Sequence, residues 1–336
     1  MIDLRSDTFT KPTEGMRKAM YIAEVGDDVY GEDVTANRLQ EMCAELTGKE
    51  SALIVSSGCM GNLIPMMIKG GRGKEIITAK EAHIVRHEIG AVSSLASTLP
   101  VFADSVNGIL DPESVRKSIH GYAYDMSETS MIEVENTTSG IPYEPETLQR
   151  IYSIAKEHGL WVHQDGARIF NASVETGVSV KEYASFSDDI TFCLSKGLGA
   201  PAFSVLCSDR SFIEEARRCR KLLGGGMRQI GIIAAAGIYA LENNVERLRE
   251  DHENRALIAQ ALSSTGWADI AISATNMVFF RSPYPMRNII EALGRRGVLM
   301  LEDAGMGRIV TSLNVSRSDA EAACDAIVSI RKEEIE

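Results

Sequence analysis

The chain has 336 residues, of which 44% are hydrophobic and 24% are charged, a composition typical of a folded globular protein of roughly one to three domains. Its 47 acidic against 35 basic residues give a net charge of -12, which excludes a broad basic face for nucleic acid. A local cluster of Arg, Lys and backbone N–H groups can still hold a phosphate or carboxylate in such a protein.

We expect neither a membrane span nor a secretion signal. Two uncharged stretches could be mistaken for membrane spans: 51–68, which polar residues and Pro65 interrupt, and 230–241, which is too short to cross a bilayer. The first seven residues carry three charges and no apolar run, unlike a signal peptide. The six cysteines form no CxxC pair, so reduced, mostly buried thiols are expected rather than disulfides or a metal site. The expected location is the cytoplasm.

Short β-rich runs alternate with helical periodicities over the first 240 residues, which predicts an α/β fold with a mostly parallel central sheet and flanking helices. Several runs are apolar almost throughout, as strands buried on both faces are. The expected strands are 52–56, 75–78, 131–135, 160–164, 189–194 and 202–207, and the expected helices are 35–47, 61–68, 145–158 and 211–222.

The last third of the chain has a different character. A long helical block, 227–262, is broken near Asn243 and Asn244. It leads to expected strands at 276–281 and 308–313 and to amphipathic helices at 286–296 and 318–332. This pattern indicates a smaller α+β unit. We therefore expect a large domain over 1–245 and a small C-terminal domain over 246–336.

The residues that first suggest chemistry are Asp165 and Lys196, each just after an expected buried strand. In an open α/β sheet, ligands bind at the carboxyl ends of strands. A lysine beside glycine in an apolar setting can act as an amine nucleophile, and an aspartate can hold a proton on a pyridine nitrogen. The pair is typical of a pyridoxal phosphate site, although an ordinary ion pair at the sheet edge is the alternative.

A turn after the first expected buried strand adds a phosphate site. It reads Ser-Ser-Gly-Cys-Met-Gly-Asn from Ser56 and opens a helix. The free N–H groups and the dipole of a helix start attract a phosphate. The same kind of turn also serves as an ordinary helix cap.

These residues belong to strings that occur in one order along nearly the whole chain, and the sequence resembles the low-specificity threonine aldolases, pyridoxal phosphate enzymes of fold type I. The resemblance implies retro-aldol cleavage of L-threonine or L-allo-threonine to glycine and an aldehyde, by a carbon-carbon lyase. The strings are DLRSDT from Asp3, GDDVYGED from Gly26, NRLQ from Asn37, SSGCMGN from Ser56, AHI from Ala82, EIGA from Glu88, ENT from Glu135, HQDGARIFNA from His163, SKGLGAP from Ser195, GGGMRQ from Gly224 and GRIVTSL from Gly307.

The resemblance also implies roles for single residues. Lys196 would form the Schiff base with the cofactor, Asp165 would pair with the pyridinium nitrogen, and His83 would stack on the ring or act as a base. The turn at Gly58 and Cys59 would hold the phosphate. The substrate carboxylate would be bound by Ser6, Arg168 and Arg308, with Arg168 also close to the cofactor.

An active site shared between subunits is implied as well. In the family, basic residues at the positions of Arg228 and Lys221 reach a neighbouring subunit's cofactor phosphate, and the resemblance favours a homotetramer. The alternative for Arg228 is a solvated charge at a helix start, where the dipole is unfavourable for a cation. Tyr30 is a candidate for the pocket wall, with simple packing as its alternative.

Departures from the family pattern concern the substrate. Cys59 replaces a common threonine in the phosphate turn, and Thr138 and Ser312 replace two family histidines. His87, one helical turn from His83, is a candidate to restore an imidazole to the substrate pocket. These changes leave open β-elimination, replacement or transamination on the same scaffold. A binding protein that holds the cofactor without turnover is a further alternative, which the presence of Lys196 and Asp165 disfavours.

Overall fold

The computed structural model describes all residues 1–336. Seven strands form a central sheet in which all but one run in the same direction; β10 is antiparallel to both of its neighbours. The predicted α/β class with a mostly parallel sheet is thereby confirmed. The strand order is β2 (Ser51–Val55), β10 (Ser204–Ser208), β9 (Asp189–Cys193), β8 (Trp161–Asp165), β7 (Glu128–Glu135), β3 (Lys74–Thr78) and β4 (Leu99–Phe102).

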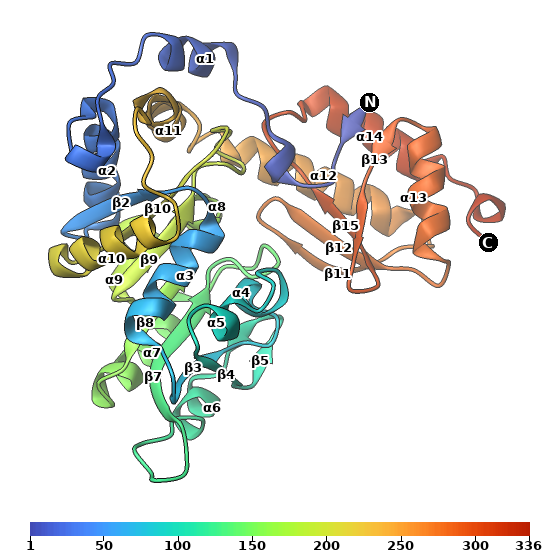
Figure 1. Cartoon of the computed structure of the whole chain (residues 1–336). Coiled ribbons are helices and arrows are strands. Elements are labelled where there is room, and N and C mark those ends of the chain that lie inside the picture. Colours follow the sequence, from blue (N-terminus) through green and yellow to red (C-terminus); the bar gives the residue numbers. More distant parts are fainter.

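Helices cover both faces of this sheet, which explains the continuous apolar runs of its strands (Figure 1). In β2, Ile54 packs into the main core, whereas Leu53 and Val55 face the opposite cluster beneath α3 and α10. The helices of this large unit are α1 (Glu14–Tyr21), α2 (Val34–Thr47), α3 (Gly58–Lys69), α4 (His83–Arg86), α5 (Ala91–Ser94), α6 (Pro112–Lys117), α7 (Pro145–Glu157), α8 (Ile169–Thr176), α9 (Val180–Ser185), α10 (Arg210–Leu222) and α11 (Gly231–Asn243).

The C-terminal part forms a second, smaller unit. Its antiparallel sheet has the order β11 (Asp269–Ala274), β12 (Met277–Arg281), β15 (Met306–Val310) and β14 (Leu301–Asp303). Helices α12 (Leu248–Ser264), α13 (Met286–Arg295) and α14 (Arg317–Val328) pack on it around a separate hydrophobic cluster. The expected break between the two long helices is confirmed, since α11 ends at Asn243 and α12 begins at Leu248.

Seven strands were not predicted. Four of them are only two residues long: β1 (Ile2–Asp3), β5 (Ser105–Val106), β6 (Ile109–Leu110) and β13 (Val298–Leu299). The other three, β4, β11 and β14, lie at the edges of the two larger sheets. The residues of these edge strands are half-buried or exposed. β11 and β14 therefore lack the apolar runs by which buried strands are recognised, and the apolar run of β4 is only four residues long and contains Pro100. The remaining expected strands and helices are present, with ends displaced by up to a few residues.

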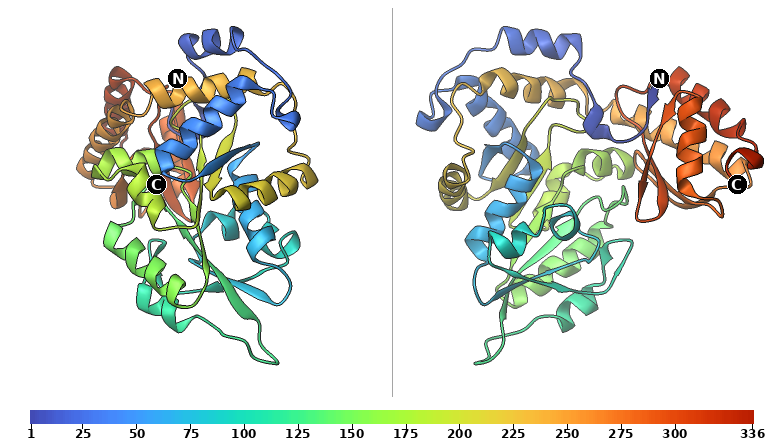
Figure 2. Two further views of the ribbon diagram at one scale, coloured as in Figure 1. Left: turned by 90° about the vertical axis from the view of Figure 1, so that its left-hand side faces the viewer. Right: turned by 45° about the vertical axis from the view of Figure 1, so that its right-hand side comes forward.

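The first residues of the chain pack with the small unit. Strand β1 (Ile2–Asp3) pairs in parallel with β13 (Val298–Leu299), and Leu4 lies fully buried in the C-terminal cluster. This placement differs from the expected assignment of the whole N-terminal segment to the large domain. The chain then passes between the two units and continues into α1 on the large unit, as the blue segment shows (Figures 1 and 2).

None of the helices combines the length and the apolar composition that a membrane span needs. All six cysteines are free thiols; three are buried, two are partly buried and Cys59 is exposed.

Candidate active site

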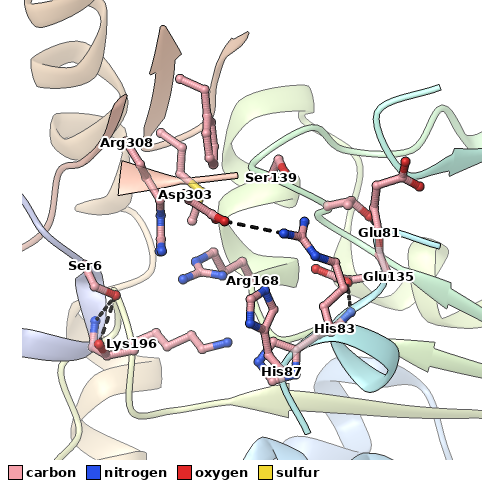
Figure 3. Close-up of a pocket in the computed structure, with 15 residues that line it drawn as sticks. Ser6, Glu81, His83, His87, Glu135, Ser139, Arg168, Lys196, Asp303 and Arg308 are labelled. Atoms are coloured by element: carbon pink, nitrogen blue, oxygen red, sulfur yellow. Dashed lines mark hydrogen bonds and ion pairs between the residues drawn. The ribbon is translucent and has the colours of Figure 1, made fainter. Parts of the chain in front are cut away.

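A cavity of about 290 Å³ lies between the large and the small unit, and we call it the central cavity. It lies at the carboxyl ends of the parallel strands, because the segments that follow β3, β7, β8 and β9 contribute His83, Thr138, Arg168 and Lys196 to its wall. Seven of the expected site residues meet there (Figure 3): Ser6, His83, His87, Thr138, Arg168, Lys196 and Arg308.

Arg168 lies at the centre of this wall and is held by Asp7. Its Nε and Nη2 donate to the two carboxylate oxygens of Asp7, each at 2.7 Å. Burial alone would raise the pKa of Asp7, but the charge and hydrogen bonds of Arg168, with help from Lys196, hold it at about 2. Asp7 is therefore ionised, and it leaves only the Nη1 edge of Arg168 free for a ligand.

Arg308 lies across the cavity on β15. It makes no hydrogen bond or ion pair within the protein, so all its N–H donors remain available to a ligand. Burial, followed by the neighbouring charge of Arg168, lowers the pKa of Arg308 below its ordinary value. A guanidinium in this setting gains from binding an anion, which would relieve both effects.

Asp165 ends β8 behind the cavity wall and is 3% exposed. Its Oδ2 accepts a hydrogen bond from Asn62 Nδ2 at 2.7 Å, and its Oδ1 accepts one from the backbone N–H of Ala167 at 2.9 Å. Asn62 also lies 3.2 Å from His163 Nε2, and His163 pairs with Asp189 at 2.5 Å. The carboxylate is thus oriented by a buried chain of polar groups that extends to the next strand.

The two expected histidines are in different electrostatic settings. The ring of His83 lies 2.8 Å from Glu88, and this hydrogen bond raises the pKa of His83. The pKa of His87 is lowered, first by partial burial and then by the charges of His83 and Arg86. Their ring centroids are 5.4 Å apart. The lowered pKa favours the uncharged form of His87 at neutral pH, whereas the hydrogen bond to Glu88 favours the charged form of His83.

The expected phosphate turn begins α3, with the Ser57 hydroxyl accepting from Met60 N–H as the helix cap. The N–H groups of Gly58 and Cys59 stand in the first turn and have no partner within the helix. A Cβ on Gly58 would lie 3.0 Å from Cys193 Sγ, so this turn is packed closely. Cys59 Sγ lies within 4.8 Å of ligand atoms of His83 and Glu88, which puts the turn beside the cavity.

Tyr30 and Arg228 do not line the central cavity. Tyr30 is 75% exposed, and Arg228 donates to Asp27 at 2.8 Å. The two lie near each other, because the backbone N–H of Asp28 donates to the carbonyl of Arg228. The expectation that Tyr30 lines the pocket is therefore not met within one chain, since the connection before α2 carries it to the outer surface.

Of the two residues that stand in place of family histidines, only Thr138 lines the cavity, and its hydroxyl donates to the carbonyl of Glu135 at 2.9 Å. Ser312 is 3% exposed and lies outside the cavity wall.

Several functional candidates escaped the sequence analysis. Three of them lie inside the family strings given above: Asp7, Asn62 and Glu88. Their contacts with Arg168, Asp165 and His83 are what mark them as part of the site, and these contacts appear only in the structure. Arg86 and Asp303 lie outside every string, on elements of different units, and no local pattern marks them.

The sheet order and the arrangement of the two units have the fold type I architecture, and solved structures agree. A threonine aldolase from Leishmania major has a TM-score of 0.84 at 20% identity, covering 97% of this chain and 98% of that one. A structure of SPT with PLP has a TM-score of 0.76 at 16% identity, covering 98% and 86%. These likenesses confirm the predicted fold.

Sequence comparison identifies the family within this fold class to which the chain belongs. Residues 3–282 match the family model of the β-eliminating lyases. The low specificity L-threonine aldolase of Escherichia coli strain K12 is 42% identical over 325 residues, which cover 96% of this chain and 97% of the relative. The chain belongs to the low-specificity L-threonine aldolase family, as the resemblance predicted.

Proposed function

We propose that the protein is a pyridoxal-phosphate-dependent carbon-carbon lyase. It cleaves a β-hydroxy-α-amino acid of the L-threonine or L-allo-threonine type to glycine and an aldehyde. The observation that carries this proposal is the convergence of Lys196, Arg308 and two histidines on one cavity, in a chain 42% identical over its length to an L-threonine aldolase.

The residues present fit the cofactor. Lys196 offers an amine in the cavity wall, and Asp165 offers a buried, oriented carboxylate for a pyridine nitrogen. The unpaired N–H groups of Gly58 and Cys59 would hold the phosphate, and the loss of a hydroxyl at Cys59 leaves these backbone donors intact. His83, fixed by Glu88, would lie against the ring.

When bound, the cofactor would supply an electron-accepting ring conjugated to the substrate nitrogen. Arg308, the free edge of Arg168 and the Ser6 hydroxyl would hold the substrate carboxylate. Fixing the carboxylate sets the rotation about the N–Cα bond, which selects the bond that breaks. His87 would accept the proton of the β-hydroxyl, a role that its lowered pKa supports better than the raised pKa of His83.

Purified protein should bind pyridoxal phosphate with a visible absorption band that borohydride removes. It should release glycine and acetaldehyde from L-threonine or L-allo-threonine. Lys196→Ala should lose both the band and the activity, whereas Lys181→Ala, an exposed lysine on α9, should retain both. A protein that binds the cofactor but forms no glycine from either amino acid would contradict the proposed reaction.

β-Elimination is the second candidate, because the matching family model is that of β-eliminating lyases. It needs the same carbanion at Cα but a leaving group at Cβ. Pyruvate and ammonia from L-serine, without glycine from threonine, would favour it. Replacement at Cβ would also be consistent with that family, and conversion of the cofactor to its amine form would indicate transamination.

We further propose a homotetramer with active sites shared between subunits. Arg228, Tyr30 and Lys221 support this, since they are exposed and lie outside the cavity of their own chain. Mixing inactive Lys196→Ala protein with inactive Arg228→Ala protein should restore part of the activity if each site draws on two chains. The mass in solution, measured by light scattering, tests the tetramer.

Two further expectations stay proposals. The division near residue 245 is supported by the two hydrophobic clusters, with Leu248 in the first and Ile258 in the second. Limited proteolysis should then cut between them before it cuts within either. A cytoplasmic location is tested by fractionation of cells that express the protein.

A further inference from the structure

Three groups that can bind a transition metal meet beside the central cavity. They are the Cys59 thiol in the first turn of α3, the His83 imidazole at the start of α4 and the Glu88 carboxyl in the turn after α4. One ligand atom of each lies within 4.8 Å of the other two. Spacing along the chain does not indicate this cluster, because its members come from two separate helices and a turn.

Each of the three side chains keeps an atom free for coordination. Cys59 is exposed, and its Sγ takes part in no hydrogen bond. Glu88 is 7% exposed and uses Oε1 twice, to accept from Asn62 Nδ2 at 3.0 Å and to bond His83 Nδ1 at 2.8 Å. Its Oε2 accepts no hydrogen bond, and His83 Nε2 takes part in none. A buried carboxylate oxygen without a partner is costly, and a bound cation would satisfy it.

The charges around this cluster favour a cation. Burial, followed by the negative charges of Glu88 and Asp165, raises the pKa of the Cys59 thiol to about 11, and the positive charge of Lys196 opposes them with a smaller effect. The hydrogen bond to Glu88 and the charge of Asp165 likewise raise the pKa of His83. A divalent cation that displaces the thiol proton would relieve this accumulation of negative charge.

The types of ligand select the metal. A thiolate, an imidazole and a carboxylate together are typical of Zn²⁺, whereas Mg²⁺ and Ca²⁺ prefer oxygen ligands alone. Bond lengths of about 2.0–2.3 Å place the ligand atoms of a tetrahedral zinc roughly 3.3–3.8 Å apart. A separation of up to 4.8 Å therefore closes by small side-chain rotations, which the exposed Cys59 can make. Three protein ligands leave the fourth position to water.

We propose that the cofactor-free protein binds Zn²⁺ through Cys59, His83 and Glu88, and that this metal competes with pyridoxal phosphate. The competition rests on the proposed function, in which the cofactor ring lies against His83 and its phosphate on the turn at Cys59. Zn²⁺ binds the thiolate, imidazole and carboxylate forms, so the protons that these groups hold pass to the solvent. Neither the metal nor the sulfur changes its oxidation state. The threonine that is common at position 59 in the family lacks the sulfur, so the site depends on the cysteine of this chain.

The metal site is tested on the full-length chain after removal of the cofactor. Calorimetry should show one Zn²⁺ bound per chain, and Co²⁺ in its place should give a thiolate-to-cobalt charge-transfer band in the near ultraviolet. Cys59→Ser and Cys59→Thr should abolish this band and weaken Zn²⁺ binding at least about a hundredfold, the upper end of what loss of an outer partner costs. Cys324→Ser, at a partly buried thiol of α14, is the matched control and should change neither.

Glu88→Gln tests the second ligand without removing the sulfur. Glutamine keeps the size of the side chain but lacks the negative charge, so Zn²⁺ binding should weaken at least about tenfold. A charge-transfer band that persists in both Cys59 variants, or the absence of Zn²⁺ binding by the cofactor-free protein, would overturn the proposed metal site. Zn²⁺ binding that Glu88→Gln leaves unchanged would exclude this carboxylate as a ligand and overturn the three-residue site.

The competition is measured by the absorption of the bound cofactor. Zn²⁺ added to the cofactor-free protein should slow and reduce the uptake of pyridoxal phosphate, excess pyridoxal phosphate should restore it, and Cys59→Thr should remove the effect of Zn²⁺. Zn²⁺ and the cofactor bound together on one chain would overturn the competition. A protein that binds Zn²⁺ through these residues but takes up no pyridoxal phosphate would contradict the proposed function and leave the metal site standing.

Discussion

Two glutamates of β7, Glu133 and Glu135, lie near the carboxyl edge of the central sheet, and burial raises the pKa of both. Glu133 and Glu135 alternate on β7 and pair in register with His163 and Asp165 on β8. Burial, then the neighbouring charge of Glu135, raises the pKa of Glu133 to about 8. Burial, then Asp165, raises that of Glu135 to about 7. At neutral pH these two glutamates therefore retain much of their proton, which limits the negative charge beneath the site.

The raised pKa of Glu133 predicts a pH-dependent stability. A carboxyl that holds its proton more tightly when folded contributes stability that is complete below the ordinary pKa of Glu, 4.5, and is lost as the pH rises towards 8. The free energy of unfolding should therefore fall between pH 5 and pH 8, and Glu133→Gln should reduce this fall. Urea unfolding at both pH values measures it, with the exposed Glu146→Gln as control. An equal fall in both variants would contradict the assignment.

Asn62 is predicted to position Asp165. It donates to Asp165 and to Glu88, and so connects the carboxylate with the group that holds His83. Asn62→Ala removes two hydrogen bonds to charged groups, so we expect cofactor affinity and kcat to fall roughly tenfold to hundredfold. Equilibrium dialysis and initial rates test this. The exposed Asn243→Ala, which removes only a contact with a backbone carbonyl, should behave like the wild type.

At the scale of elements, α3 approaches the sheet through a glycine. A Cβ on Gly61 would lie 2.4 Å from Thr191 Cγ2 of β9, a distance that no packed side chain tolerates. The close approach brings the helix start against β9, whose end leads to Lys196. The helix that offers N–H groups to a phosphate and the strand that leads to the lysine are therefore in direct contact.

Gly61→Ala should consequently destabilise the protein by about 1–3 kcal/mol, because the helix or Thr191 must move. Gly294 of α13 is a matched helical glycine with no atom within 4 Å of its added Cβ. Gly294→Ala should instead stabilise by about 0.5–1 kcal/mol, since alanine loses less entropy on folding. Thermal unfolding of both variants measures these changes in stability. A Gly61→Ala protein that is as stable as the wild type and binds the cofactor equally well would refute the close-contact argument.

At the scale of the molecule, the site is assembled from three distant parts of the chain. Asp7 of the N-terminal segment binds Arg168 of the large unit and accepts from Asn276 of the small unit at 3.3 Å. Ser6 lines the cavity beside it. The segment is fixed by β1 and by Leu4 in the C-terminal cluster, so the small unit controls the position of residues that face the substrate.

Leu4→Ala should therefore affect both stability and binding. Truncating a fully buried leucine costs about 2–5 kcal/mol, and a loosened segment should also raise the KM for amino-acid substrates. Leu222→Ala, at a leucine that is 76% exposed, should change unfolding by less than about 0.5 kcal/mol and leave KM unchanged. A destabilised Leu4→Ala protein with normal KM would show that the segment is fixed by other contacts.

Local patterns in the sequence determined the α/β class, most helices and buried strands, and the positions of Asp165 and Lys196 at strand ends. These follow from hydrophobic periodicity and from residues adjacent along the chain. Edge strands such as β14 escaped because they are short and their half-exposed residues carry no such period. Tyr30 was expected at the pocket, but the path of the connection before α2 decides its position.

Tertiary structure alone decided the contacts that form the wall of the central cavity. Asp7 with Arg168 and Arg86 opposite Asp303 join residues that are more than 150 positions apart. Periodicity reports which face of an element is buried and says nothing about which distant side chain it will meet. The pairs of charges across the cavity form only where the two units meet. The candidate cofactor residues were therefore readable from the chain, while the composition of the cavity wall was not.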